Sequence, residues 1–243
     1  MITSNRIWAV VPVKRFSAAK TRLAPVLDGA ERAQLARLMF EDVLAALISR
    51  QDLFAGTLVV TADAAAAILA RRRSAKVVFD AAERGINAAI GQAVQHIHAH
   101  ANAGDGLAVV PSDMPHVTPN AFEQQAFIAL STKPSLAIAA ATNDRGTNLF
   151  ACRPANAISP CFGPFSFDRH LVAALQAGLA VHTLCIPELS LDIDRPEDLR
   201  TFLRLKTHTQ THAFLARISI LDRIDEVHNP ARQPGRIAAE VWS

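Results

Sequence analysis

Trp8-Ala-Val-Val-Pro-Val-Lys-Arg-Phe-Ser-Ala-Ala-Lys-Thr-Arg-Leu23 is the stretch of sequence that decides the fold. Residues 8–13 are apolar and suit a strand that is buried on both faces. The loop that follows carries Lys14, Lys20 and Arg22, and three gathered cations repel one another unless a polyanion such as a triphosphate neutralises them. Ligands of open α/β sheets bind beyond the carboxyl ends of strands, where these cations stand. A solvated basic loop is the alternative.

Bulk composition places the chain among ordinary globular proteins and excludes several classes. Its 243 residues can bury one sizeable core, with 50% of them apolar and 19% charged. The net charge is only +3 and the basic residues are scattered, so nucleic acid is not an expected partner. No apolar run approaches the ~20 residues of a membrane helix, and no signal-peptide pattern opens the chain. We therefore expect a cytoplasmic protein without membrane contact.

The cysteines and the missing motifs narrow the chemistry further. Cys152, Cys161 and Cys185 are odd in number and lack C-x-x-C spacing, so we expect reduced, mostly buried thiols and neither a disulfide framework nor a zinc site. The Gly-x-Gly-x-x-Gly fingerprint and the P-loop motif are both absent, which argues against a dinucleotide dehydrogenase and a Walker-type NTPase. His96 and His100 share a helical face, but they lack a third ligand, and a solvated helix end is the simpler interpretation.

Strand-like and helix-like segments alternate along the chain, which predicts an α/β fold. Apolar, β-rich runs predict strands at 8–13, 56–61, 76–79, 106–110, 135–140 and 180–185. Helical periodicity and capping signals predict helices over 28–49, 63–73, about 85–100 and from 118 to before 133. A polar turn is expected at 143–148, and Ser166 is expected to cap a further helix. Beyond Lys206, apolar residues at helical spacing predict a face that must bury against the body or a second subunit.

Three aspartates are candidate metal ligands. Asp113 follows the predicted strand 106–110 in a loop bounded by prolines, where a carboxylate can coordinate Mg²⁺. Asp192 and Asp194 alternate around Ile193, so in an extended segment both side chains project to one side and can share a cation. Structural alternatives stay open for two of them. Asp113 suits a turn, and Asp194 stands three residues before a glutamate, as an N-cap does in a capping box.

Loop-to-helix transitions supply candidate contacts to smaller groups. Asn87, beside the unpaired N–H groups of a helix start, could bond the edge of a base, although a capping role also explains it. Thr147 and Asn148 suit a phosphate or carboxylate of an acceptor, and turn chemistry explains them equally. Ser166 stands where a helix N-terminus accepts an anion. A nucleophilic dyad of this serine with His170 is disfavoured because no G-x-S-x-G elbow surrounds the serine.

An ordered set of short motifs resembles a known family of enzymes. The set is Val11-Pro-Val-Lys14, Ala19-Lys-Thr-Arg-Leu23, Ser112-Asp-Met-Pro115, Gly146-Thr-Asn148, Phe162-Gly-Pro-Phe-Ser-Phe167, Arg169-His170 and Leu191-Asp-Ile-Asp-Arg-Pro-Glu-Asp-Leu199. In this order, over residues 7–204, it is similar to the 2-phospholactate guanylyltransferase family of coenzyme F420 biosynthesis, whose members also use phosphoenolpyruvate or 3-phosphoglycerate. Each motif is short, and the specificity lies in the ordered set.

The resemblance implies a GT-A-like nucleotidyltransferase fold, with a Rossmann-like mixed central sheet flanked by helices. It also implies that GTP and the phosphorylated three-carbon acid react to give a guanylylated diphosphate and pyrophosphate, with Mg²⁺ as cofactor. By position, the implied roles are triphosphate binding for Lys14, Lys20 and Arg22, Mg²⁺ binding for Asp113, Asp192 and Asp194, contact with guanine and ribose for Glu83 and Asn87, and acceptor binding for Thr147, Gly163 and Ser166. The implied catalytic residues are Lys20, Arg22, Asp113 and Asp192.

Residues 1–206 would form the nucleotidyltransferase domain, and residues 207–243 a C-terminal helical extension and tail. The acceptor's phosphate is already an anionic nucleophile at neutral pH, so alignment and charge neutralisation suffice and no Ser, Cys or His base is needed. Two alternatives remain: nucleotidyl transfer to another phosphorylated acceptor, such as a sugar phosphate or molybdopterin, and a non-catalytic nucleotide-binding module. The sequence does not decide which of the three acids is the acceptor. It also leaves the oligomeric state open, and a homodimer is one possibility.

Overall fold

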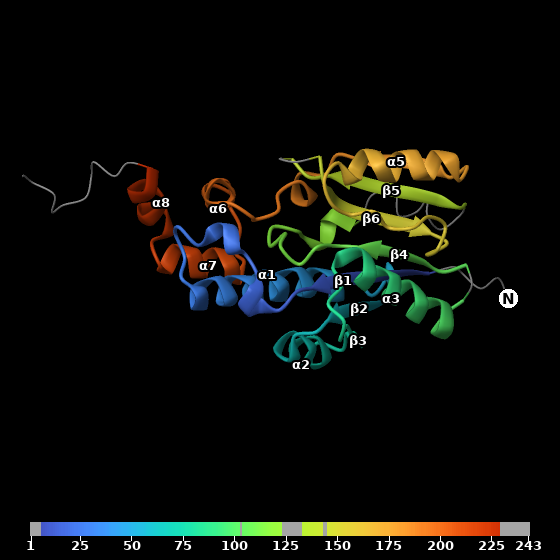
Figure 1. The fold of residues 1–243 in the computed structure, drawn as a ribbon, viewed down its shortest axis with the longest axis horizontal. Helices are drawn as coiled ribbons and strands as arrows, with labels where there is room; N and C mark the ends of the chain where they lie inside the picture. The colour runs from blue at the N-terminus through green and yellow to red at the C-terminus, as the bar shows by residue number, and fades with distance from the viewer. Residues whose placement is uncertain (1–5, 103, 123–132, 143–144, 229–243) are drawn as a thin grey trace, which may run out of the picture.

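The computed structural model describes residues 6–102, 104–122, 133–142 and 145–228, and a mixed β-sheet forms their centre (Figure 1). Within these residues seven strands follow the spatial order β3-β2-β1-β4-β6-β5-β7. Their bounds are β1 Ile7–Val13, β2 Phe54–Thr61, β3 Lys76–Phe79, β4 Gly106–Val109, β5 Ser135–Ala140, β6 Thr147–Arg153 and β7 Ala180–Leu184. All of β1 except Pro12 is buried, which confirms the expectation of a strand covered on both faces.

Strand direction decides which loops meet. β1 pairs in parallel with β2 and with β4, and β2 pairs in parallel with β3. The carboxyl ends of these four strands therefore lie along one edge of the sheet. β6 runs antiparallel to both of its neighbours, β4 and β5, while β7 is parallel to β5. The loops after β1, β3 and β4 thus open on the edge where ligands of α/β sheets bind.

Helices cover both faces of the sheet. Their bounds are α1 Gly29–Ile48, α2 Ala64–Arg72, α3 Ile86–His100, α5 Ser166–Gln176, α6 Pro196–Leu203, α7 Gln210–Arg217 and α8 Ile220–His228. α1 and α2 share one apolar cluster with the sheet, and α3 and α5 share the cluster on its other face (Figure 1). α1 begins with a capping box, one of the capping signals for the helix expected at 28–49, in which the Asp28 carboxylate accepts from the Glu31 N–H at 2.8 Å. No helix in the described ranges is long and apolar enough to cross a membrane.

A third apolar cluster joins the C-terminal helices to the body. It contains Leu35 and Met39 from α1, Phe202 from α6, Leu215 from α7 and Ile224 from α8. In Figure 1, α6, α7 and α8 lie beside the end of α1 that is farther from the sheet. The apolar face predicted beyond Lys206 therefore buries against the body of the same chain.

Two local predictions near the acceptor motifs are corrected by the structure. The polar turn expected at 143–148 ends earlier, because β6 already begins at Thr147; residues 143–144 lie outside the described residues. Ser166 is the first residue of α5 and not its N-cap. Phe165 occupies the cap position with a left-handed backbone (φ 54°), and no side chain caps the helix. The Ser166 hydroxyl is consequently available for another contact.

Two further predictions are only partly met. The segment expected to be helical from 118 starts as a short 3₁₀ helix, Pro119–Phe122, and residues 123–132 lie outside the described residues. All three cysteines are free thiols, as expected, but Cys152 alone is buried. Cys161 is half-buried and Cys185 is exposed, so the expectation of mostly buried thiols is wrong.

Candidate active site

The basic loop, residues 14–22, leaves the carboxyl end of β1 and turns through two short 3₁₀ helices, Phe16–Ala18 and Thr21–Leu23. Lys20 lies between them with a left-handed backbone (φ 55°), which costs a non-glycine residue on the order of 1 kcal/mol. The fully buried Leu23 anchors the end of the loop in the third cluster. As a result the Lys20 side chain, only 8% exposed, is directed into the protein.

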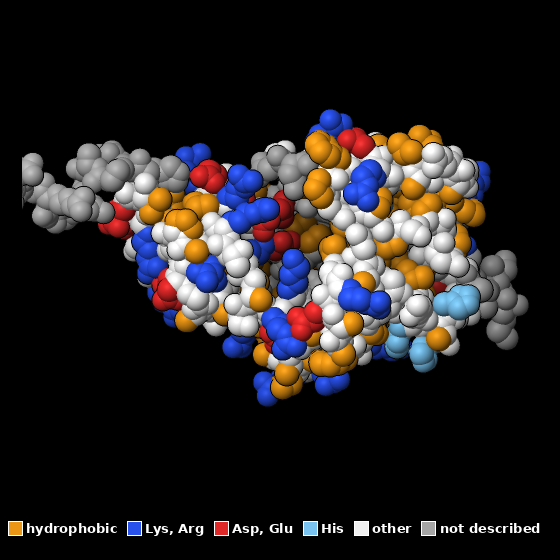
Figure 2. All heavy atoms as spheres, viewed as in Figure 1, with side chains coloured by type: hydrophobic (Ala, Val, Ile, Leu, Met, Phe, Trp, Pro, Cys, Tyr) orange, Lys and Arg blue, Asp and Glu red, His pale blue; other side chains and the backbone are white. Residues whose placement is uncertain are grey.

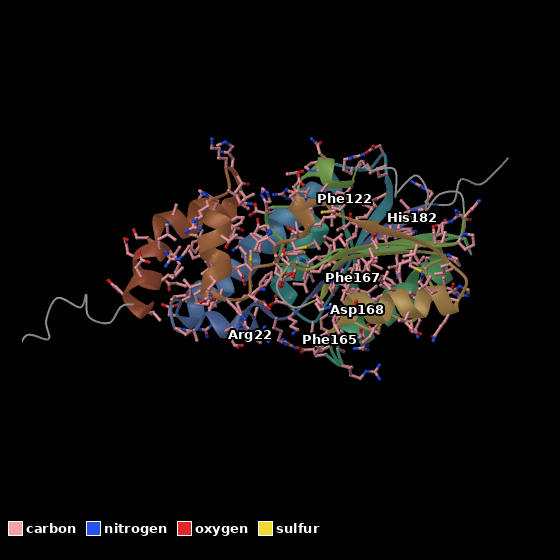
Figure 3. All side chains as sticks on the ribbon, turned by 90° about the horizontal axis from the view of Figure 1, so that it is seen from above. Arg22, Phe122, Phe165, Phe167, Asp168 and His182 are labelled. Atoms are coloured by element: carbon pink, nitrogen blue, oxygen red, sulfur yellow. The ribbon has the colours of Figure 1, made fainter. Side chains whose placement is uncertain are left out.

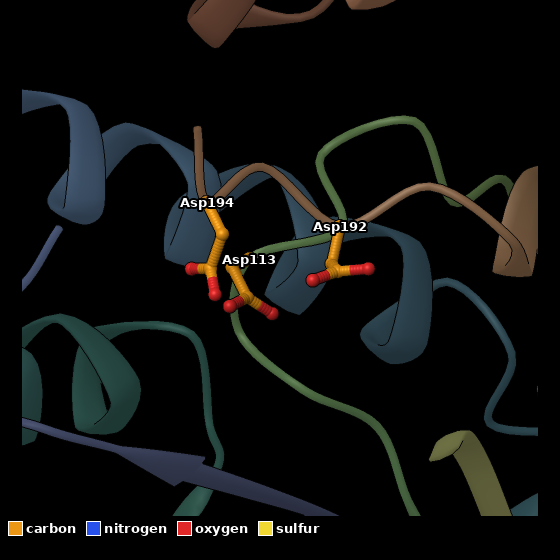
Figure 4. A group of neighbouring side chains, drawn as sticks. All are labelled: Asp113, Asp192 and Asp194. Atoms are coloured by element: carbon orange, nitrogen blue, oxygen red, sulfur yellow. The ribbon is translucent and has the colours of Figure 1, made fainter. Parts of the chain in front are cut away.

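The three predicted metal ligands form one group, the aspartate triad Asp113, Asp192 and Asp194. One carboxylate oxygen from each lies within 4.8 Å of the other two (Figure 4). The Ile193 N–H donates to the Asp113 carbonyl oxygen at 3.0 Å, which ties the 191–195 segment to the loop after β4. Ile193 itself is fully buried, so the aspartates on either side of it turn to the opposite side. This confirms the alternation argument for their common direction.

Lys20 neutralises only part of the aspartate triad. Its Nζ lies 2.7 Å from Asp113 Oδ2 and 2.7 Å from Asp194 Oδ1, and the Arg22 guanidinium lies 3.2 Å from Asp194 Oδ2. Burial would lower the pKa of Lys20, but the two carboxylates outweigh burial and raise it. Burial likewise opposes ionisation of Asp194, but Lys20 and then Arg22 overcome it and lower its pKa.

Asp192 is the uncompensated member of the triad. Burial, reinforced by the charge of Asp113, raises the pKa of Asp192 to about 6. Its hydrogen-bond partner is the amide of Asn148, which donates from Nδ2 to Oδ1 at 3.3 Å. A buried carboxylate next to another one is stabilised by a cation, and three carboxylate oxygens suit a hard divalent ion such as Mg²⁺ or Mn²⁺. The residues present therefore fit a divalent metal.

A cavity of about 530 Å³ opens beside the triad, a volume suited to a small-molecule ligand. Figure 2 shows acidic side chains at the bottom of a hollow near the middle of the molecule, with basic side chains around it. Among the predicted site residues, the wall includes Lys14, Lys20, Arg22, Glu83, Asp113 and Asp194. Asp192 is not on this wall, but one of its carboxylate oxygens lies within 4.8 Å of an oxygen of Asp113 and of Asp194, which are on the wall.

The predicted acceptor residues Thr147, Gly163 and Ser166 are not on this cavity wall, and Thr147 is linked to the triad through its neighbour Asn148. Thr147 and Asn148 are consecutive residues of β6, and Asn148 is the residue that bonds Asp192. The Thr147 and Ser166 hydroxyl oxygens are 3.0 Å apart and buried. Gly163, with φ 131°, lies in the loop that leads to α5, and Figure 3 marks Phe165 and Asp168 at the beginning of that helix. Thr147 and Ser166 are thus brought together near the triad.

His170 orients the two hydroxyl groups. The Cys161 N–H donates to His170 Nε2 at 2.9 Å, so this nitrogen carries no proton in the neutral ring, and the other nitrogen, Nδ1, does. Nδ1 lies 3.1 Å from Thr147 Oγ1 and donates to it. Either hydroxyl can donate across the Thr147–Ser166 pair, and when Thr147 is the donor the Ser166 proton is left for another acceptor. Burial lowers the pKa of His170 to about 4, which keeps the ring neutral.

Two predicted nucleotide contacts have protein partners here. Asn87 Nδ2 donates to the Phe162 carbonyl oxygen at 3.0 Å, and Asn87 Oδ1 accepts from the Phe162 N–H at 2.7 Å. This amide therefore ties α3 to the loop before Gly163, and it is not on the cavity wall. Its contact with a nucleotide remains a prediction. Glu83 is on the wall, and its Oε1 lies 2.6 Å from the Arg15 guanidinium.

Asp80 lies on the wall of the cavity and was not among the site residues predicted from the sequence. It directly follows β3 and is 7% exposed. The sequence could have indicated it, because Asp80 directly follows the predicted strand 76–79. A carboxylate in that position lies at the same edge of the sheet as the basic loop and Asp113. Asn148, the partner of Asp192, was predicted only as an acceptor contact.

Known proteins with similar sequences are enzymes that transfer nucleotides, which agrees with a site of acidic and basic residues beside a cavity. Residues 7–233 match the model of the family described as "Guanylyl transferase CofC like". The chain belongs to this CofC-like guanylyltransferase family. A phosphoenolpyruvate guanylyltransferase of Roseiflexus sp. (strain RS-1) is 40% identical over 198 residues, which cover 79% of this chain and 83% of the relative. A 2-phospho-L-lactate guanylyltransferase of Methanothermobacter thermautotrophicus is 32% identical over 210 residues, 86% and 90% of the two chains.

Solved structures place the CofC-like chain among nucleotidyltransferase folds. A structure assigned to the nucleotide-diphospho-sugar transferases, from Desulfovibrio desulfuricans G20, superposes with a TM-score of 0.70 at 18% identity, covering 92% of this chain and 98% of that one. A nucleotidyl transferase of Methanothermobacter thermautotrophicus has a TM-score of 0.52 at 18% identity, with 88% and 99% covered. The CofC-like chain is a nucleotidyltransferase with a mixed α/β fold, as the motifs implied.

Proposed function

We propose that the protein transfers GMP from GTP to the phosphate of a three-carbon acid and releases pyrophosphate, in the biosynthesis of coenzyme F420. The observation that carries the proposal is the contact of Lys20 with the aspartate triad at one wall of the cavity, in a chain of the CofC-like family. The acceptor is phosphoenolpyruvate, 2-phospholactate or 3-phosphoglycerate. GTP is a cytoplasmic nucleotide, so the proposal also implies a cytoplasmic location.

The proposed reaction is one displacement at phosphorus. A phosphate oxygen of the acceptor attacks the α-phosphorus of GTP, the bond from the α-phosphorus to the bridging oxygen breaks, and pyrophosphate leaves with the electron pair of that bond. Asp113, Asp192 and Asp194 would hold Mg²⁺, which supplies charge neutralisation and alignment of the phosphates when bound. Lys14, Lys20 and Arg22 bind the triphosphate, and Lys20 and Arg22 stabilise the departing pyrophosphate.

The acceptor is held on the β6 side of the triad. With Thr147 as the donor to Ser166, the Ser166 hydroxyl donates its own proton to a phosphate or carboxylate oxygen of the acid. Thr147 and the backbone at Gly163 complete this subsite. No group in it needs to remove a proton, because the acceptor phosphate is ionised at neutral pH.

The proposal is tested by incubating the protein with GTP, Mg²⁺ and each of the three acids, and measuring pyrophosphate. We expect release with at least one acid. Asp192→Asn keeps the shape of the side chain and removes a ligand charge, so turnover should fall at least about 100-fold while the circular dichroism spectrum is unchanged. Asp222→Asn, which makes the same exchange at an exposed position of α8, should retain wild-type turnover.

Three results would contradict the proposal in different ways. Near-normal turnover by Asp192→Asn would remove the aspartate triad from the mechanism. Pyrophosphate release only with a sugar phosphate would indicate another acceptor. Binding of GTP without release, with any acceptor, would indicate a non-catalytic nucleotide-binding module.

A further inference from the structure

Asp80 forms a second polar site of the cavity, apart from the aspartate triad. Its side chain is buried, and Gln92 Nε2 donates to Asp80 Oδ1 at 2.7 Å. Among the residues that the structure describes, no group bonds Asp80 Oδ2. A carboxylate accepts hydrogen bonds and donates none, so Asp80 offers further acceptor capacity to a ligand in the cavity.

The sheet separates the end of β3, which Asp80 follows, from the end of β4, which leads to Asp113. Asp80 follows β3 and Asp113 follows β4, and the parallel strands β3, β2, β1 and β4 are consecutive neighbours. Asp113 lies in the loop that leaves β4, and with strands about 4.8 Å apart, three spacings separate the ends of β3 and β4 by roughly 14 Å. This is the reach of an extended nucleoside triphosphate from its base to its phosphates. A nucleoside triphosphate with its phosphates at the basic loop and Asp113 would therefore place its base on the Asp80 side of the cavity.

The wall around Asp80 suits the flat faces of a base. Val60, Ala62, Ile86 and Ala89 are apolar, and all four line the cavity. Apolar walls with one fixed polar group are typical of sites that bind a ring and read one of its edges. Glu83, the other carboxylate on this side, is already ion-paired with Arg15, which leaves Asp80 as the acceptor.

The chemistry of the four bases selects one of them. Guanine presents two adjacent donors on its pairing edge, N1–H and the 2-amino group, and these match the two oxygens of a carboxylate. Adenine N1 and cytosine N3 would turn a lone pair toward the carboxylate, and uracil offers one N–H between two carbonyls. We propose that Asp80 reads the guanine edge and selects GTP, and that Gln92 is the positioning residue that orients it. This inference rests on the proposed function, because it requires a nucleotide in this cavity.

The experiment reverses the hydrogen-bonding pattern on both molecules. On the protein an acceptor oxygen of Asp80 becomes a donor, and on the base the 2-amino donor becomes an acceptor. Asp80→Asn keeps an oxygen for the Gln92 bond but replaces the other acceptor by an NH₂ donor. Xanthosine triphosphate carries a carbonyl in place of the 2-amino group, so it should fit the amide of this variant and repel the wild-type carboxylate. We expect wild-type kcat/KM for GTP to exceed that for xanthosine triphosphate at least about 10-fold, and the order to reverse in Asp80→Asn. Asp222→Asn should keep the wild-type preference.

Inosine triphosphate provides a test that needs no variant. It lacks only the 2-amino group, so wild-type protein should use it at least about 10-fold less well than GTP, measured as kcat/KM and as Kd without acceptor. Equal use of GTP and inosine triphosphate would overturn the inference, as would an Asp80→Asn variant that keeps the GTP preference or loses activity with both GTP and xanthosine triphosphate. Absence of wild-type turnover with GTP and all three acids would instead contradict the proposed function.

Discussion

Asp194 and Asp198 show how one hydrogen bond assigns the role of a residue. The sequence allowed Asp194 to be the N-cap of the helix at Pro196. In the structure Asp198 Oδ2 accepts from the Asp194 N–H at 2.9 Å and from the Arg195 N–H at 2.7 Å. Arg195, and not Asp194, is therefore the N-cap of α6, and Asp198 is the residue that bonds its backbone. The Asp194 carboxylate contacts Lys20 and Arg22 instead.

His170 makes the stability of the fold dependent on pH. Its pKa falls from the ordinary histidine value of 6.5 to about 4 in the folded chain, because burial disfavours the charged ring. Below pH 6.5 the unfolded chain binds a proton that the folded chain does not, so this contribution to stability is complete above pH 6.5 and is lost as the pH falls toward 4. Between about pH 7 and pH 5 the loss should be about 2 kcal/mol.

The measurement is urea unfolding of the wild type and of His170→Gln at the two pH values. The variant should be less stable at about pH 7, because the bonds to Thr147 and Cys161 are disturbed. The difference from the wild type should shrink by about 2 kcal/mol at about pH 5, because glutamine does not titrate. A difference that stays constant between the two pH values would show that His170 is not buried as a neutral ring.

At the scale of elements, α1 supplies an acceptor for the first turn of α7, in addition to the N-cap Thr209, whose hydroxyl accepts from the His212 N–H. Asp42 accepts from the N–H groups of Gln210 and Thr211 at 3.0 and 2.9 Å, and from the Thr211 hydroxyl. Burial raises the pKa of Asp42, although these hydrogen bonds work against that shift. The N-terminus of α7 therefore depends on a residue that lies 168 positions away in the sequence.

Asp42→Ala should destabilise the docking of α7. Loss of the carboxylate leaves donors of α7 without an acceptor, which costs about 1–3 kcal/mol. Hydrogen exchange should accelerate in Gln210–Arg217, while the amides of β1 keep their protection. Glu41→Ala, one residue away and paired with Arg37 on the same helix, should cost less than about 0.5 kcal/mol. Equal effects of the two variants would remove Asp42 from this role.

At the scale of the whole molecule, the C-terminal helices support the wall of the active-site cavity. Met39 belongs to the third apolar cluster and also lines the cavity. Leu215 of α7 is fully buried in the same cluster. The division into residues 1–206 and 207–243 remains a prediction, but in the described residues one core crosses that boundary.

Leu215→Ala should lower the free energy of unfolding by about 2–5 kcal/mol, because it leaves a cavity in this shared core. Leu221 of α8, 39% exposed, offers the matched control, and Leu221→Ala should cost less than about 0.5 kcal/mol. Thermal unfolding with and without GTP and Mg²⁺ checks both variants. A Leu215→Ala protein as stable as the control would show that α7 contributes little to the fold.

Local sequence pattern was sufficient to predict most strands of the sheet and the three aspartates of the triad. The apolar run of β1, the capping box of α1 and the alternation of Asp192 and Asp194 around Ile193 were predictable because each depends on neighbours in the chain. The order of motifs likewise identified the CofC-like family. The prediction of Ser166 as an N-cap was wrong, because Phe165 takes the cap position with a left-handed backbone that is uncommon for a bulky residue.

The sequence by itself determined the α/β fold, the basic loop, the three aspartates and the family. Only the tertiary structure decided which residues touch: that Lys20 bonds Asp113 and Asp194, that Asn148 is the partner of Asp192, that Asn87 holds the backbone of Phe162, and that Asp80 lies on the cavity wall. The physical reason is the range of the interactions. Periodicity and capping act within a few residues, whereas these contacts join strand ends and loops that meet only after the sheet has formed.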